Sequence, residues 1–283
     1  MIFSLISSFG FGQQDLELGI PIAEIPLKNI DLVSFDTKDQ VFASNSAGDI
    51  YLFSAEGKRL NLFSPARQGR LNQLEAAWTV NIFSFSSDLQ EYRVLDRFLN
   101  PLTESGFLLT DVNLAKAATF GNNNVVWVWD ESDLSLKSLD YLRNLVIQSQ
   151  PMNLILNSEN LAVSEIREFK NRVFMNMPES GIFVFDNQGN LLKKLNVKTT
   201  QRLCFYKEHL LWFEQDTLMT TSISTGKNEE IATILVSDFR YLQVGQERLA
   251  IVSKDKLTLY PMPDWLKNIM IVRNDARSLI FSD

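Results

Sequence analysis

The chain has 283 residues, of which 45% are hydrophobic and 22% are charged, and 20 of them are phenylalanines. This composition is globular rather than disordered, and closed all-β folds often reach this length as one unit. The net charge of −7 and the sequence pI near 5.0 argue against nucleic-acid binding as the main function, because that binding needs clustered Lys and Arg. A short basic run such as Lys193-Lys194 is typical of a solvated strand face.

The N-terminal segment MIFSLISSFGFG is apolar and ends in small residues before Gln13. It resembles the hydrophobic core and end of a secretory signal peptide, although no Lys or Arg precedes Lys28. We therefore expect residues 1–12 to be a truncated signal peptide and the mature protein to be periplasmic or extracellular. The alternative is a buried N-terminal strand. The segment is too short to cross a bilayer, and no later segment is a convincing membrane helix.

Strand hairpins follow along the chain. Short runs rich in Val, Ile, Phe, Tyr, Trp and Thr alternate with polar residues and are broken by Gly, Asn, Asp and Ser. In GIFVFDNQGNLLKKLNV at 181–197, DNQG separates two such runs, and its Gly189 can adopt the positive φ of a hairpin turn. The sequence predicts equivalent hairpins at 50–63, 80–95, 125–139, 181–197, 218–231 and 249–260.

The spacing of the hairpins predicts the fold. Six positions are taken as equivalent strand ends: Phe53, Phe85, Trp129, Phe185, Thr221 and Tyr260. They are 32, 44, 56, 36 and 39 residues apart, about 41 on average, which is the size of a four-stranded propeller blade. The long third step predicts an insertion within 142–160. A further strand pair precedes each hairpin, as at 31–46, so we expect an all-β, six-bladed β-propeller of four-stranded antiparallel blades over residues 16–263.

The hairpins IYLFSAEGKRLNLF, VWVWDESDLSLKSL and IFVFDNQGNLLKKL resemble the outer hairpins of NHL-like and TolB-like propellers. STGK at 224–227 resembles a turn of quinoprotein-type repeats, but Ile231 stands where those repeats have tryptophan. The segment 74–102 is similar to exported bacterial propeller proteins of uncharacterised activity. These resemblances imply a propeller fold and an exported protein, and they imply no activity.

The last blade, at 236–260, supplies three strands and then meets Pro261 and Pro263, which cannot donate to a β-ladder. We therefore expect LELGIPIAEIPL at 16–27 to close the ring as the outer strand against the hairpin 249–260. The alternative is a loose N-terminal arm. Residues 264–283 form a C-terminal extension, which could be an extra edge strand, a partner-binding segment or a disordered end.

Two residues and two motifs are candidate chemical sites. Cys204, the single cysteine, lies among apolar neighbours and is interpreted as a buried, inert thiol. His209, the single histidine, is interpreted as part of a turn that leads into a strand rather than as a catalytic base. The stretch 186–190 is polar but lacks the spaced acidic ligands of a calcium loop, and Gly226-Lys227 lacks the glycine spacing of a phosphate-binding loop.

Four acidic residues in one blade, Asp88, Glu91, Asp96 and Glu104, could suggest paired catalytic carboxylates. Their neighbours on the strand include Arg93, so the sequence favours cross-strand or surface ion pairs instead.

Trp78, Trp127 and Trp129 could stack on a sugar or grip a peptide if they were exposed near the mouth of a propeller. Packing between neighbouring blades is the alternative that the sequence favours, because such sheets bury both faces.

Two functions from different classes remain open at this stage. The first is a non-catalytic binding or scaffold propeller of the bacterial periplasm or cell surface, which engages a protein or another ligand through its loops or channel. The second is a metal-dependent hydrolase of the six-bladed lactonase type, in which carboxylates and amides of the inner strands hold a divalent ion in the channel. No residue is assigned as catalytic, cofactor-binding or metal-binding, and no cofactor is predicted.

Overall fold

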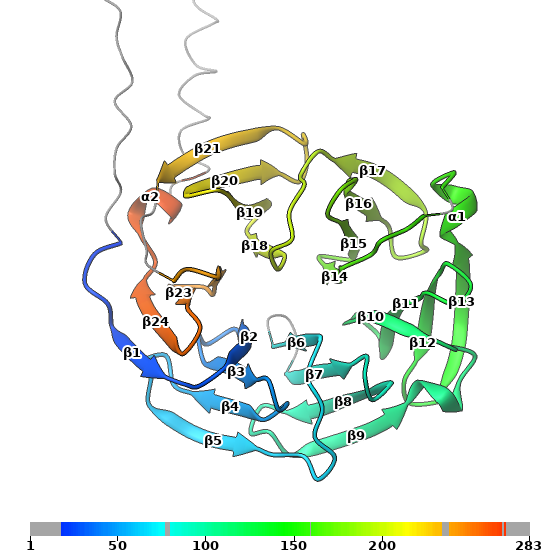
Figure 1. Ribbon diagram of the computed structural model, residues 1–283, viewed down its shortest axis with the longest axis horizontal. Helices are drawn as coiled ribbons and strands as arrows, with labels where there is room; N and C mark the ends of the chain where they lie inside the picture. Colours follow the sequence, from blue (N-terminus) through cyan, green and yellow to red (C-terminus); the bar gives the residue numbers. More distant parts are fainter. Residues whose placement is uncertain (1–17, 77–79, 159, 234–237, 268, 270–283) are drawn as a thin grey trace, which may run out of the picture.

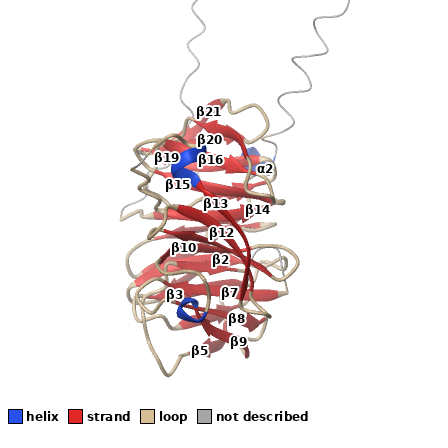
Figure 2. Cartoon of the chain, turned by 90° about the vertical axis from the view of Figure 1, so that its right-hand side faces the viewer, coloured by secondary structure: helices blue, strands red, loops and turns tan. Residues whose placement is uncertain are grey.

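The computed structural model describes residues 18–76, 80–158, 160–233, 238–267 and 269, and in this part of the chain six four-stranded antiparallel sheets form a ring (Figure 1). From the side, the strands of the ring form a disc (Figure 2). The predicted six-bladed β-propeller is therefore confirmed. No helix among the described residues is long and apolar enough to cross a membrane.

Each blade runs from an inner first strand to an outer fourth strand. Blade 1 contains β2 (Ile30–Phe35), β3 (Val41–Asn45), β4 (Ile50–Phe53) and β5 (Arg59–Phe63). Blade 2 contains β6 (Gln73–Glu75), β7 (Asn81–Ser86), β8 (Glu91–Asp96) and β9 (Pro101–Gly106). Blade 3 contains β10 (Ala115–Phe120), β11 (Val125–Asp130), β12 (Ser135–Asp140) and β13 (Leu145–Pro151).

The remaining blades follow the same order. Blade 4 contains β14 (Glu165–Phe169), β15 (Arg172–Met177), β16 (Gly181–Phe185) and β17 (Leu191–Leu195). Blade 5 contains β18 (Cys204–Tyr206), β19 (His209–Glu214), β20 (Thr217–Ser222) and β21 (Asn228–Thr233). Blade 6 contains β22 (Tyr241–Val244), β23 (Arg248–Val252), β24 (Lys256–Pro261) and β1 (Ala23–Pro26). Three short helical segments lie outside the sheets: η1 (Phe107–Leu109), α1 (Met152–Ile155) and α2 (Asp264–Lys267).

The hydrophobic core lies between the blades. Each of the six junctions between neighbouring blades holds one cluster of buried apolar side chains in the described part of the chain. Middle strands such as β3 and β11 are therefore buried on both faces, whereas the outer strands β5 and β13 are largely exposed. Trp127 and Trp129 belong to the cluster between blades 3 and 4, which confirms that they pack between blades. Trp78 lies outside the described residues.

The predicted alignment of the repeats was wrong for two blades. Phe85 and Trp129 lie on second strands, whereas the other four positions lie on third strands. The hairpins at 80–95, 125–139 and 249–260 therefore join second and third strands, and those at 50–63, 181–197 and 218–231 join third and fourth strands. The true third strands begin at residues 50, 91, 135, 181, 217 and 256, which are 41, 44, 46, 36 and 39 residues apart.

The insertion predicted within 142–160 is mostly the ordinary fourth strand β13, followed by the single turn of α1. Both kinds of hairpin show the same alternation of apolar and polar residues. The pattern alone therefore could not assign a hairpin to the inner or the outer half of a blade.

A recurrent turn joins many of the strands. The side chain of its first residue accepts hydrogen bonds from the backbone N–H groups two and four residues later, as the carboxylate of Asp186 does from Gln188 and Asn190 at 2.8 Å each. The fourth residue has a positive φ, which is 73° at Gly189. The same turn begins at Asp36, Asn45, Ser54 and Asp96. DNQG is thus a hairpin turn, as predicted, and its aspartate is used within the turn.

The ring closes with a strand from the other end of the chain. In Figure 1, β1 lies beside β24, and the two pair antiparallel from Ala23 opposite Leu259 to Pro26 opposite Lys256. Ile22 N donates to Leu259 O at 2.7 Å and extends this pairing. The closure predicted from Pro261 and Pro263 is therefore confirmed, and the loose-arm alternative is wrong for residues 23–26.

A second contact at the closure joins the first turns of blades 1 and 6. The first turn of a blade is the turn between its first and second strands. The carboxylate of Asp39 accepts hydrogen bonds from Gln246 N at 2.6 Å and from Glu247 N at 2.9 Å. Gly245 permits this approach, because a Cβ there would lie 2.1 Å from Asp39 Oδ1. The closure therefore combines a backbone ladder with a carboxylate that fixes the neighbouring turn.

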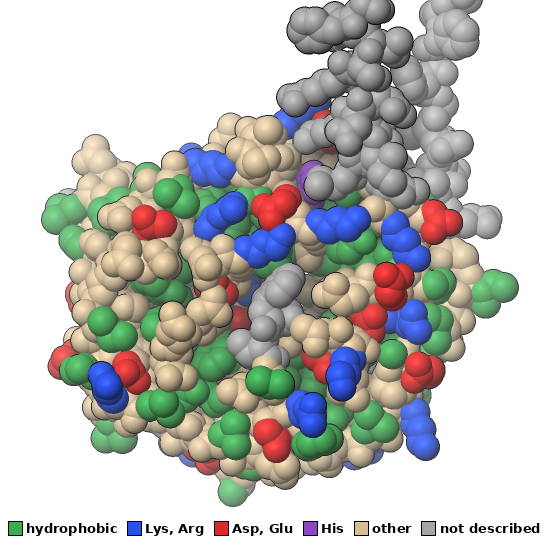
Figure 3. Space-filling view, turned by 180° about the vertical axis from the view of Figure 1, so that it is seen from behind, with side chains coloured by type: hydrophobic (Ala, Val, Ile, Leu, Met, Phe, Trp, Pro, Cys, Tyr) green, Lys and Arg blue, Asp and Glu red, His purple; other side chains and the backbone are tan. Residues whose placement is uncertain are grey.

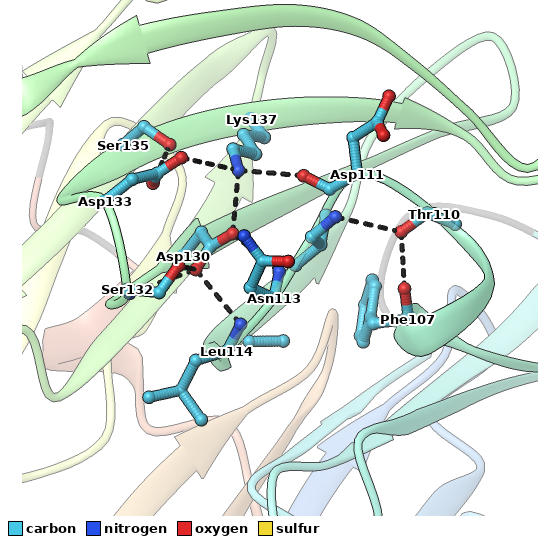
Figure 4. Close-up of polar contacts among 12 residues, drawn as sticks. Phe107, Thr110, Asp111, Asn113, Leu114, Asp130, Ser132, Asp133, Ser135 and Lys137 are labelled. Atoms are coloured by element: carbon cyan, nitrogen blue, oxygen red, sulfur yellow. Dashed lines mark hydrogen bonds and ion pairs between the residues drawn. The ribbon is translucent and has the colours of Figure 1, made fainter.

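Blade 3 carries a different clamp, shown in Figure 4. Asp130, which is fully buried, accepts hydrogen bonds from Asn113 N at 2.9 Å and Leu114 N at 3.1 Å, in the loop that arrives from blade 2. Lys137 Nζ lies 2.7 Å from both Asp130 Oδ2 and Asp133 Oδ2. Burial alone works against ionisation, but Lys137 and the other donors outweigh it and lower the pKa of Asp130 to about 2.

Candidate functional site: a cationic mouth

A cavity of about 500 Å³ opens at the ends of the first strands of blades 1, 4, 5 and 6. First strands lie nearest the axis of the ring in Figure 1, so this cavity is the mouth of the ring. Its wall includes the turns that follow β2, β14, β18 and β22, which the repeat places side by side although they are far apart in sequence. We call this cavity the cationic mouth because of the charges that line it.

Cationic side chains outnumber anionic ones in this wall. The cations are Arg167, Lys170, Lys207 and Lys267, and the anions are Asp36 and Glu247. The lining residues thus carry two more cations than anions, on a protein whose net charge is −7. Glu75, Glu165 and Glu208, which are not lining residues, pair with Arg167 and Lys170. Figure 3 shows Lys and Arg side chains gathered near the centre of one face of the ring.

Arg167 is held in the inner wall by two carboxylates. Its Nη2 lies 3.4 Å from Glu165 Oε1, and its Nε lies 4.0 Å from Glu75 Oε1 on blade 2. Burial raises the pKa of Glu75, and Arg167 partly offsets this effect. Gln73 Nε2, also on blade 2, donates to Ile166 O at 3.3 Å. Side chains of blades 2 and 4 therefore meet near the axis of the ring.

The exposed lysines of the mouth are also positioned by contacts. Lys207 Nζ donates to Lys267 O at 2.7 Å and lies 5.1 Å from the centre of the Tyr206 ring. Lys170 forms an ion pair with Glu208, and Lys267 forms one with Glu247 at 3.2 Å. The C-terminal helix α2 thus contributes one wall of the mouth. Three lysines from three segments of the chain lie at this cavity in defined positions.

The inner strands do not present the ligand set of a channel metal site in the part of the chain that the structure describes. Glu75 and Glu165 lie close to the guanidinium of Arg167, and no group of three or more His, Cys, Asp or Glu is placed to hold an ion among the described residues.

The structure also places the residues that were weighed as single chemical sites. Cys204 is buried in β18, and burial raises the pKa of its thiol to about 12, as expected for an inert cysteine. His209 is buried and is the first residue of β19, directly after a turn.

The acidic residues of blade 2 are used in ion pairs and turns, as the sequence favoured. Arg93 lies 3.2 Å from Glu91 and 3.3 Å from Glu104. The pKa of Asp96 is lowered by its hydrogen bonds to Asn100 and the following turn. The structure thus places ion pairs where paired catalytic carboxylates had been considered.

Sequence reasoning did not find the cationic mouth. Lys170 and Lys207 are single lysines in first turns, and Lys267 lies in the C-terminal extension. A correct register of the repeats could have aligned Lys170 with Lys207, because both directly follow a first strand.

In sequence, the chain matches no model of a known protein family and no curated relative. Its fold is similar to that of several solved propeller structures. The WD40 domain of Neurospora crassa Pan2 is 10% identical, with a TM-score of 0.56 over 80% of this chain and 73% of that one. The propeller domain of Myceliophteria thermophila Cps50 (Swd1) is 11% identical, with a TM-score of 0.61 over 85% and 99%.

A chain of the mitotic checkpoint complex is also similar, with 10% identity and a TM-score of 0.62 over 93% of this chain and 98% of that one. At such low identities these likenesses show the propeller fold alone. The NHL-like or TolB-like subtype stays a prediction.

Proposed function

We propose that this protein is a non-catalytic binding or scaffold propeller that engages an acidic segment of a protein partner at the cationic mouth. The observation that carries the proposal is the excess of Lys and Arg around a cavity of about 500 Å³ on a protein of net charge −7. A basic pocket with an acidic surround attracts a carboxylate-rich segment and repels nucleic acid from most of the remaining surface.

The arrangement of the mouth suits a peptide rather than a small anion. Its cationic side chains come from blades 4 and 5 and from α2, so the positive charge is spread around a wide opening. Phe205 and Tyr206 add aromatic surface between the charges, and aromatic residues beside cations are common at the centres of protein interfaces. The rigid ring holds these groups in place, so binding orders few side chains.

Fluorescence anisotropy with a labelled polyglutamate peptide tests the proposal. We expect the wild-type protein to bind the peptide at about 0.1 M salt and to release it at about 1 M salt, where the Debye length falls from about 10 Å to about 3 Å. The double variant Lys170→Glu, Lys207→Glu should bind at least about tenfold more weakly, because it reverses two charges at the mouth.

A matched control is the double variant Lys58→Glu, Lys194→Glu, which makes the same change in net charge at exposed positions outside the mouth. We expect it to bind nearly as the wild type does. Equal weakening in both variants, or no binding by the wild type, contradicts recognition at the mouth.

We further propose that the protein acts in the bacterial periplasm or at the cell surface. The support is the apolar block MIFSLISSFGFG before Gln13 and the similarity of 74–102 to exported bacterial propellers. Intact-mass measurement on protein from the native host, expressed from an upstream start, tests this address. A cytosolic protein that retains residues 1–12 rejects the export proposal and leaves the binding proposal untouched.

A further inference from the structure

A second cavity, of about 240 Å³, lies between blades 3 and 4. We call it the inter-blade cavity. Its wall is formed by the first turns of both blades, by β12 and β13 of blade 3, and by the turn between β16 and β17 of blade 4. The turn after β14 separates it from the cationic mouth, because Lys170 lines the mouth and Asn171 lines the inter-blade cavity.

Amide side chains form most of the polar rim of the inter-blade cavity. They are Asn122, Asn123, Gln148, Asn171, Asn187 and Gln188. No Lys or Arg is among the lining residues, and Glu168 is the one ionisable side chain there. Each amide offers both donors and an acceptor, so this rim complements groups that donate and accept at once.

Buried residues form the floor. Trp127, Ser138, Glu168 and Val173 are all buried and all line the cavity. Trp127 belongs to the core between the blades, so its position is fixed by packing. The floor therefore combines the small exposed part of Trp127, which is 4% exposed, with a hydroxyl and a carboxyl group.

Hydrogen bonds across the gap between the blades hold the rim in place. Asn122 Nδ2 donates to Asn171 Oδ1, and Gln148 Nε2 donates to Gln188 O. Asn123 and Asn171 have φ values of 57° and 60°, a region that asparagine tolerates better than most residues. Both walls are thus set before a ligand enters, which lowers the entropy lost on binding.

Glu168 is only partly used by the protein. Its Oε1 accepts a hydrogen bond from Asn171 N at 2.7 Å, and Oε2 has no hydrogen-bond partner among the described residues. Burial raises the pKa of Glu168 to about 7, with a further contribution from the nearby Glu75. Near neutral pH this carboxyl group can therefore either donate or accept a hydrogen bond.

We propose that the inter-blade cavity binds a neutral, polyhydroxylated ligand of the size of a single sugar ring. Hydroxyl groups both donate and accept, as the amide rim requires, and the apolar C–H groups of such a ligand can contact Val125, Ile147 and the exposed part of Trp127 in the wall. The lack of Lys and Arg in the wall argues against an anionic ligand. The volume lies just below the range of about 300–1,000 Å³ that is typical of drug-sized ligands, which favours one ring over several.

Ligand-observed NMR at pH 7 with D-glucose, D-galactose, N-acetyl-D-glucosamine and myo-inositol tests the proposal. We expect saturation transfer from the protein to at least one of these probes. The uronic acid of a hexose that binds should bind more weakly, because no Lys or Arg lines the cavity to pair with its carboxylate. Saturation transfer to none of the four probes overturns the proposal.

Two variants on strand β13 localise the binding. Gln148 and Gln150 both donate to Gln188 O, but only Gln148 lines the cavity. Gln148→Ala should weaken binding about tenfold, whereas Gln150→Ala should leave it nearly unchanged. Equal effects of the two variants overturn the assignment.

Glu168→Gln provides an independent check that keeps the shape of the side chain. It should weaken binding as well, and its circular dichroism spectrum shows whether it is folded. Normal affinity in the folded variant contradicts the role of the carboxyl group in ligand binding. None of these results depends on whether the cationic mouth binds an acidic peptide.

Discussion

Blade 3 and blade 6 have the same four-stranded plan but are held together differently. In blade 3 all four strands are continuous in sequence, and the buried pair of Asp130 and Lys137 fixes the loop that arrives from blade 2. In blade 6 the outer strand β1 comes from the other end of the chain, and the turn is fixed by Asp39 of blade 1. Blade 3 thus adds a buried charge pair to its ladder, whereas blade 6 adds the hydrogen bonds from its first turn to Asp39.

The exposure of the outer strands explains why the ladder matters. In β1 only Ile25 is buried, and β13 of blade 3 has no fully buried residue. Side-chain burial alone therefore holds an outer strand weakly. Blade 3 compensates with the covalent turn between β12 and β13, but blade 6 has no such link between β24 and β1.

Removing β1 is expected to have the largest effect. Deletion of residues 13–28 exposes the edge of β24 and the Ile25 site, and it should lower the free energy of unfolding by about 5 kcal/mol, from lost ladder hydrogen bonds and apolar burial. Chemical denaturation monitored by tryptophan fluorescence measures this loss. A deletion limited to residues 2–12 is the control and should leave stability unchanged. An equal stability of both truncated proteins contradicts closure by β1.

Loss of the Asp130–Lys137 pair in blade 3 should cause the second-largest loss of stability. Asp130→Asn leaves the ammonium of Lys137 without its fully buried carboxylate partner, which should cost about 3 kcal/mol. Asp133 is the other partner of Lys137, and the side chain of Asp133 is 46% exposed. Asp133→Asn should therefore cost less than about 1 kcal/mol. Urea denaturation of the two variants at pH 7 makes the comparison. Equal losses would show that burial of the pair does not matter.

Glu168 lies at the junction of blades 3 and 4. Its contribution to the stability of the fold should depend on pH in the opposite direction to that of Asp130. Its folded pKa of about 7 lies above the usual 4.5, so the folded state binds the proton more tightly. This contribution to stability is complete below about pH 4.5 and is lost as pH rises through about 7.

Between pH 5 and pH 8 the wild type should therefore lose about 2 kcal/mol of stability relative to Glu168→Gln, after allowance for solvent screening at the cavity. Thermal unfolding at a series of pH values measures this loss. Parallel pH profiles would exclude a raised pKa for Glu168.

The turn of blade 6 should give the smallest effect. A methyl group in Gly245→Ala would lie 2.1 Å from Asp39 Oδ1, so the carboxylate must move away from Gln246 N and Glu247 N, at a cost of about 1–2 kcal/mol. In an Asp39→Ala background the same substitution should cost less, because the clash with Oδ1 is gone and only the 3.1 Å approach to Phe35 Cγ remains. A double-mutant cycle measured by urea denaturation distinguishes this coupling from a simple effect of glycine on the backbone.

Several features could be predicted from local sequence alone. The turn at DNQG needs only an aspartate that accepts two backbone hydrogen bonds and a glycine with positive φ, and both are visible in the sequence. The closure followed from Pro261 and Pro263, which prevent a further strand directly after the last hairpin. The burial of Cys204 and the start of a strand at His209 followed from their apolar neighbours.

The register of the blades and both cavities could not be predicted in this way. Phe85 and Phe53 look equivalent in alternation, yet one lies on a second strand and the other on a third, because both hairpins pack between neighbouring blades. Lys170 and Lys207 acquire a shared environment only when the ring brings their turns together. Trp127 and Gln188 likewise meet only across the junction of blades 3 and 4.

The sequence by itself determined the fold class, the number of blades, the turns and the closing strand, because these depend on alternation, turn residues and proline within short segments. The tertiary structure decided which hairpin lies inside or outside each blade, where charges gather at the mouth, and which amides share a cavity with Glu168. The physical reason is that a propeller packs blade against blade. Each site is therefore built from side chains whose distance in space is set by the ring and not by their separation along the chain.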